Sequence, residues 1–122
     1  MALLTFAGRL TADPVVDRSD RTLSAEFVVA ESTGAYVRGE WVPHAVPTTR
    51  WVRTPHQLTD AVAATLRSGV HVVVTGREHT ELRGRHEVRV VEAVRVGVLL
   101  AAEQTVTVHP HPGPGSWWPT DV

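Results

Sequence analysis

The sequence predicts an all-β protein: a five-stranded Greek-key barrel with one α-helix between its third and fourth strands. Two observations support this prediction. Five separate segments have strand character, most of them alternating apolar with polar residues, as half-buried strands do. A single segment after the third of them has apolar residues at helical spacing. One helix is too few for helical repeats or a doubly wound sheet, and five strands are few for a β-sandwich.

The alternation is clearest in the first two segments. Leu4, Phe6 and Leu10 share one parity, and Ala25 and Phe27 belong to a similar series. In the last segment the valines at 88, 90, 94, 96 and 98 are expected to face inward, and Glu92 interrupts them as a bulge would. The expected strands are therefore residues 4–10, 23–29, 49–53, 70–77 and 88–98.

The helix has start and stop signals of its own. Thr54 is expected to be the N-cap, with Pro55 at the first helical position and Gln57 completing a capping box. Gly69 is expected to end the helix. Its buried face should consist of residues four positions apart, Leu58, Val62 and Leu66.

Glycine and proline mark the irregular parts of the chain. Residues 33–48 contain two of each and are expected to form a long irregular loop. From residue 103 the chain becomes rich in proline and glycine. We therefore expect one domain at 1–102 and a tail at 103–122, which includes a possible short strand at 105–108.

The charge is nearly balanced, which does not favour a duplex DNA binder. All 12 basic residues are arginine, and they face 11 acidic residues within the first 100 positions. The absence of cysteine excludes disulfides, thiolate metal sites and a cysteine nucleophile. There is no apolar run of membrane-spanning length and no basic leader, so a cytoplasmic protein without a membrane segment is expected.

Four blocks of sequence occur in an order that is typical of one family. They are Gly8–Pro14, Ala25–Ala30, Thr49–Arg53 and Leu66–Arg77. Over residues 1 to about 100 the chain resembles the bacterial single-stranded DNA-binding protein family. The resemblance implies an OB-fold, usually a homotetramer, that binds single strands without sequence preference in DNA replication, recombination or repair.

The sequence also departs from that family. Pro55 and His56 stand where the family often has an aromatic residue, and Leu82 stands where it often has tryptophan. The acidic C-terminal tip that recruits the family's partners is missing, because the tail contains only Asp121 near its end. These departures indicate a divergent paralogue, of actinobacterial type.

Single-stranded nucleic acid is held by aromatic side chains that stack on bases and by cations along the backbone. Trp51 is the best candidate platform, since alternation with Val52 places it on the outer face together with Arg53. The alternative is a tryptophan buried in a subunit interface or under the 34–48 loop. Arg9 and Arg50 are expected to share the outward orientation of Trp51.

Two further groups are candidates. Tyr36 and Trp41, flanked by Arg38, form a second platform in the long loop or else pin that loop to the barrel. In the last hairpin glutamates alternate with arginines, so that much of this edge is neutralised. The candidate phosphate contacts there are Arg77 and the tip residues Arg83 and Arg85, whose charges have no local partner.

Neither catalysis nor a resident metal is expected. The aspartates near the first turn lack the companion residues of known catalytic motifs. His109 and His111 have no third ligand nearby, so no metal or other cofactor is predicted.

Two functions therefore stay open. The first is binding of single-stranded DNA, with RNA not excluded, because stacking and phosphate contacts serve both. The second is an OB-fold protein-interaction module that has largely lost affinity for nucleic acid. In that case the Trp117–Trp118 tail is the element that contacts a protein partner.

Overall fold

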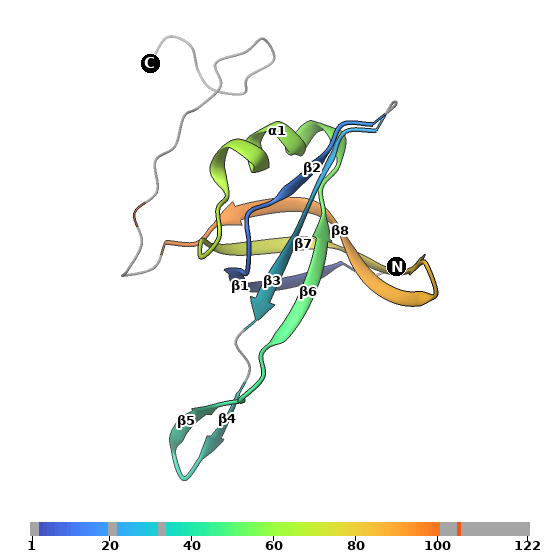
Figure 1. Cartoon of the computed structure of the whole chain (residues 1–122). Helices are drawn as coiled ribbons and strands as arrows, with labels where there is room; N and C mark the ends of the chain where they lie inside the picture. Colours follow the sequence, from blue (N-terminus) through green and yellow to red (C-terminus); the bar gives the residue numbers. More distant parts are fainter. Residues whose placement is uncertain (1–2, 20–21, 32–33, 101–104, 106–122) are drawn as a thin grey trace.

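The computed structural model describes residues 3–19, 22–31, 34–100 and 105. Its centre is a closed barrel in which β1 pairs with β7, β7 with β8, β8 with β6, β6 with β3, and β3 again with β1 (Figure 1). The β6–β8 pair is parallel and the others are antiparallel. This is the strand order of the predicted Greek-key barrel, and the fold class is confirmed. The barrel strands are β1 (Leu4–Leu10), β3 (Ser24–Glu31), β6 (Thr48–Arg53), β7 (His71–Arg83) and β8 (His86–Val98).

The barrel closes because β1 is shared between two neighbours. Residues Leu4–Arg9 pair with β7, and Arg9 and Leu10 also pair with β3. Gly8 lies where the strands converge, and a Cβ there would come within 2.4 Å of the Ala30 carbonyl oxygen. Only glycine fits such a close approach of two backbones. A short strand, β2 (Val15–Asp17), then continues along β3.

The core follows the predicted alternation. Phe6, Ala25 and Phe27 are buried, and so are Val52 on β6 and Val72 on β7. Helix α1 (His56–Thr65) lies across one end of the barrel (Figure 1). Val62 of this helix and Leu66, its C-cap, belong to the core, as expected. Within the described residues no helix is long and apolar enough to span a membrane.

The predicted signals at the helix ends are wrong. Pro55 is the N-cap, and no side chain caps the first turn. The Thr54 hydroxyl is buried and accepts the backbone N–H of Ala25 at 3.0 Å, so it ties the helix entry to β3 instead. The helix ends with Leu66 as its C-cap, and Gly69 lies in the following turn, where its N–H donates to the Leu10 carbonyl.

The bulge of β8 lies two residues beyond its predicted position. Thr75 pairs with Arg95 and Gly76 with Ala93, so Val94 is the extra residue. Val94 is exposed, whereas Val91 and Ala93 are buried, contrary to the predicted series of inward valines. A bulge shifts the register by one residue, which reverses the faces of the strand on its two sides.

The expected irregular loop contains a second, two-stranded sheet. Strands β4 (Gly34–Val37) and β5 (Glu40–Pro43) form a hairpin that projects from the barrel (Figure 1). Its turn residues, Arg38 and Gly39, both have positive φ, as the tight turns of two-residue hairpins require. The predicted strand at 105–108 lies outside the described residues, apart from Thr105, which is not in a strand.

Replacing Thr54 by valine should destabilise the fold by about 1–3 kcal/mol, because it leaves the buried Ala25 N–H without its acceptor. Urea unfolding of the wild type and of Thr54→Val measures this difference. The matched control is Thr49→Val, which removes an exposed hydroxyl from β6, the strand that Thr54 follows, and should change stability little. An equal effect of the two substitutions would contradict the role of Thr54.

Candidate nucleic-acid interface

Trp51 lies on the outer face of β6, as alternation predicted. Its neighbour Val52 is buried in the core, while the Trp51 residue is 40% exposed. Val28 on β3 and Val90 on β8 flank it in register. A pocket of about 270 Å³ opens beside it, lined by residues of the first turn, of β2 and of β3: Thr11, Ala12, Asp13, Val15, Glu26, Phe27 and Val28. The site thus joins an exposed aromatic side chain to a largely apolar pocket.

The end of the β7–β8 hairpin reaches this face. The β7–β8 arm (residues 77–89) continues past the pairing of β7 with β1. It places the guanidinium carbon of Arg83 5.2 Å from the centre of the Trp51 ring. A guanidinium at this distance over an indole is attracted by the ring. Arg83 therefore covers part of the Trp51 ring.

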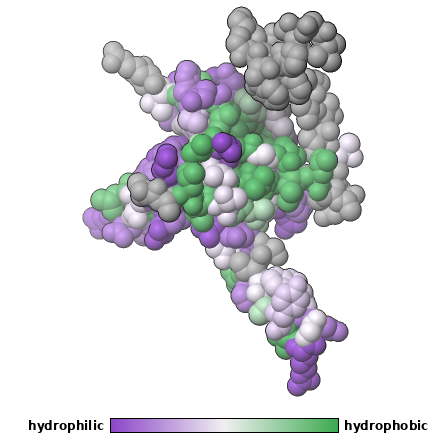
Figure 2. All heavy atoms as spheres, turned by 180° about the vertical axis from the view of Figure 1, so that it is seen from behind, coloured by the Kyte–Doolittle hydropathy of each residue, from purple (hydrophilic) through white to green (hydrophobic). Residues whose placement is uncertain are grey.

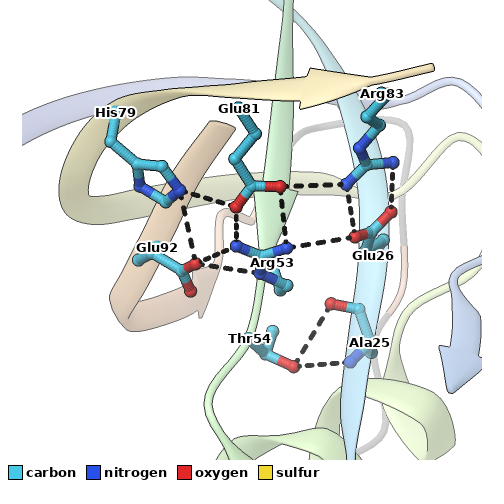
Figure 3. Close-up of polar contacts among 8 residues, drawn as sticks. All are labelled: Ala25, Glu26, Arg53, Thr54, His79, Glu81, Arg83 and Glu92. Carbon is cyan, nitrogen blue, oxygen red and sulfur yellow. Dashed lines mark hydrogen bonds and ion pairs between the residues drawn. The ribbon is translucent and has the colours of Figure 1, made fainter. Parts of the chain in front are cut away.

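Arg83 is ion-paired, contrary to the prediction that its charge has no local partner. Its two terminal nitrogens donate to the two carboxylate oxygens of Glu26 on β3, at 3.0 and 2.6 Å (Figure 3). These hydrogen bonds raise the pKa of Arg83. Sequence alternation alone does not reveal this pair, because β7 and β3 are not paired with each other in the sheet.

Arg53 lies at the centre of a cluster of carboxylates (Figure 3). Its Nε donates to Glu92 at 2.8 Å, and Nη1 donates to Glu81 at 3.1 Å. The His79 Nε2 lies 2.6 Å from the same Glu81 carboxylate. The hydrogen bonds from Arg53, and then that from His79, lower the pKa of Glu81 to about 2, and the pKa of Arg53 is raised in return. Arg53 shares the face of Trp51, as predicted, but its N–H groups already donate hydrogen bonds to glutamates of the same chain.

Arg50 does not share that orientation, so this prediction is wrong. Adjacent residues of a strand point to opposite faces. Arg50 therefore turns away from Trp51, and its guanidinium lies 5.1 Å from the centre of the Phe6 ring. It donates to Glu31 at 2.9 Å and lies 3.5 Å from Glu78.

The other predicted arginines are exposed. Within the part of the chain that the structure describes, Arg9, Arg38, Arg77 and Arg85 form no ion pair. They lie on β1, at the tip of the β4–β5 hairpin, and at the base and tip of the β7–β8 arm. Of the seven predicted arginines, these four have donors available to a ligand.

The aromatic pair of the long loop is on the projecting hairpin. Tyr36 and Trp41 face each other in register, with ring centres 5.2 Å apart and edge-to-face geometry. They are 75% and 50% exposed. The hairpin that carries this pair projects from the barrel (Figure 1), and both side chains are exposed.

Four residues of the site were not predicted as its members: Glu26, His79, Glu81 and Glu92. Three of them, His79, Glu81 and Glu92, place ligand atoms within 4.8 Å of one another, a spacing that a metal ion could use. Arg53 already donates to both glutamates of this trio. The arrangement is therefore an ion-pair cluster in which a guanidinium supplies the positive charge.

The stability contributed by Glu81 should depend on pH in a defined window. Its folded pKa of about 2 lies below the ordinary value of 4.5, so its contribution is complete above about pH 4.5 and is lost as the pH falls through 2. The difference in unfolding free energy between the wild type and Glu81→Gln should be constant from neutral pH to about pH 5. It should then shrink on further acidification, in urea titrations with Glu87→Gln as the charge control. A difference that already shrinks between pH 7 and pH 6 would contradict this assignment.

Comparison with solved structures supports the fold, while no protein-family model and no curated protein matches the sequence. The small single-stranded DNA-binding protein of Streptomyces coelicolor is similar, with a TM-score of 0.68 and 22% identity over 81% of this chain and 94% of that one. A Plasmodium falciparum SSB in complex with ssDNA has a TM-score of 0.69 and 16% identity over 81% and 95%. The SSB domain of a Synechococcus sp. protein has a TM-score of 0.61 and 18% identity over 80% and 94%. The chain therefore has the OB-fold that is found in single-stranded DNA-binding proteins.

Proposed function

We propose that this chain binds single-stranded DNA without sequence preference and without catalysis, on the outer face of β3 and β6. The observation that carries the proposal is Trp51, an exposed tryptophan beside a pocket on that face. The likeness to single-stranded DNA-binding proteins, one of them solved with ssDNA, supports it. In this reading the protein acts in the cytoplasm, on the nucleoid, in DNA replication, recombination or repair.

Stacking is the main attractive term. An aromatic platform contributes about 1–3 kcal/mol per base, and every base offers a face to it. Trp51 supplies one platform, and the exposed Tyr36–Trp41 pair supplies a second one on the β4–β5 hairpin. A single strand that contacts both would run from the barrel face onto the hairpin.

The exposed arginines provide the phosphate contacts. Arg9, Arg38, Arg77 and Arg85 are the leading set, because within the described residues no carboxylate occupies them. Arg53 and Arg83 lie beside Trp51 but contact phosphate only when their glutamates release them. Arg50 packs on Phe6 and is not part of the proposed set.

The proposed assembly is a homo-oligomer, with a homotetramer favoured. Figure 2 shows apolar side chains gathered on the side of the barrel turned away from the view of Figure 1. Exposed apolar residues flank β1 and extend along the end of β8 and beyond it: Leu3, Val94, Leu99 and Leu100. A patch of this kind is typical of a surface that another protein covers.

A protein-interaction module is the second candidate. The observation that favours it is the pairing of Arg53 and Arg83 with glutamates of the same chain, which neutralises the face around Trp51. The Trp117–Trp118 segment, which lies outside the described residues, is the proposed partner-binding element. A gel shift at low salt separates the two functions, because micromolar protein retards a 35-mer only in the first case.

Replacing Trp51 by alanine should weaken oligo-dT binding by about 1–3 kcal/mol, roughly 5- to 150-fold in Kd, because one stacked base loses its platform. Fluorescence anisotropy of labelled oligo-dT measures this loss. Trp51→Phe is the matched control and should retain part of the affinity, because it keeps an aromatic face. Equal affinity of the wild type and Trp51→Ala would contradict stacking at this site, and oligo-rU and duplex competitors define the ligand class.

The wild type should sediment as an oligomer, and Leu99→Glu should shift it toward the monomer, because the substitution places a charge in the apolar patch. Sedimentation velocity at two protein concentrations measures both. Glu87→Gln, at an exposed position of the β7–β8 arm, is the control and should leave the oligomer unchanged. A monomeric wild type would contradict the proposed assembly.

A further inference from the structure

The β7–β8 arm is held over the face that carries Trp51. In the order of the sheet, β8 and β6 lie between β7 and β3 along this side of the barrel. Arg83 of β7 nevertheless makes a two-pronged hydrogen bond to Glu26 of β3. The arm must bend across β6 to make this contact, and Figure 3 shows Arg83 and Glu81 on β7 facing Arg53 and Glu26 below them.

Two ion pairs hold the arm in this position. Arg83 pairs with Glu26, and Glu81 of the arm pairs with Arg53 of β6. Together these four residues are called the arginine latch: Glu26, Arg53, Glu81 and Arg83. Arg83 also covers the Trp51 ring, so the guanidinium that closes the latch shields the stacking surface as well.

We infer that the arginine latch regulates access to the Trp51 site, and that phosphate of a single strand opens it by replacing Glu26 on Arg83 and Glu81 on Arg53. This inference rests on the proposed function. Binding would then move Arg83 away from the face of Trp51 and make the same guanidinium a phosphate contact. The latch makes the protein select ligands that combine a phosphate with a base.

Exchanging a glutamate for a phosphate leaves each arginine paired with an anion. A guanidinium binds carboxylate and phosphate oxygens with the same two-pronged geometry, so the arginines stay paired when one anion replaces the other. The four side chains of the latch are 25–33% exposed, which lets water reach the released glutamates. No charge is left buried and unpaired in either state.

The latch predicts that removal of its carboxylates strengthens binding. Glu26→Gln and Glu81→Gln should each lower the Kd for oligo-dT several-fold at low salt. The slope of log K against log salt should change little, because Arg53 and Arg83 contact phosphate in the complexes of both the wild type and the variants. Glu87→Gln is the matched control, since Glu87 lies exposed on the same arm and has no ion pair within the described residues. Latch variants that bind no more tightly than Glu87→Gln would overturn the inference.

A second measurement needs no DNA. In a full-length chain with Trp41, Trp117 and Trp118 replaced by phenylalanine, acrylamide quenching reports on Trp51 alone. Glu26→Gln in this background should increase quenching of Trp51, and Glu87→Gln should not. If Glu26→Gln increases the quenching of Trp51 but the wild type does not bind oligo-dT, the proposed function is contradicted and the contact of the closed latch with Trp51 is not. Unchanged quenching and unchanged affinity in a protein that binds oligo-dT would contradict the latch alone.

Discussion

The structure depends on the closure of the barrel by β1. This strand runs along β7 and then meets β3, and the two backbones come so close that Gly8 has no room for a side chain. Once β1 joins β7 to β3, the parallel contact between β6 and β8 completes the ring. Closure buries alternate residues of β3 and β6 and leaves the residues between them on one continuous outer surface. Trp51, Arg53 and Glu26 lie on that surface for this reason.

The outer surface combines an aromatic platform with internal charge compensation. Two arginines face three glutamates there, so the centre of the surface carries no positive excess. Arg9, Arg38, Arg77 and Arg85, which have no ion pair in the described residues, lie on β1, on the β4–β5 hairpin and on the arm. Under the proposed function, attraction for a phosphate backbone would come from these arginines, whereas the centre of the surface would offer stacking. Such a surface suits a flexible single strand better than a rigid duplex, because a single strand can reach separated contacts.

The sequence predicted the barrel because alternation is a local property. The inward series of β1 and β3, the helix face and the outward position of Trp51 all follow from it. The orientation of Arg50 was predicted wrongly although it was within reach, since a residue beside Trp51 must face the other way. The pairing of Arg83 with Glu26 could not be predicted from the sequence, because it depends on the bend of the arm across β6. The hairpin turn at Arg38 and Gly39 was missed because it lacks the more common Asn-Gly or Asp-Gly signal, and Thr54 looked like a cap because its partner Ala25 lies on a distant strand.

Hydrogen exchange with and without oligo-dT tests most directly whether single strands bind on the Trp51 face. We expect changed amide protection at the tip of the β7–β8 arm (residues 82–87) and in the β4–β5 hairpin (residues 34–43). We expect no change in α1, which lies across one end of the barrel. Changes confined to α1, or no change at saturating oligo-dT, would contradict binding on this face.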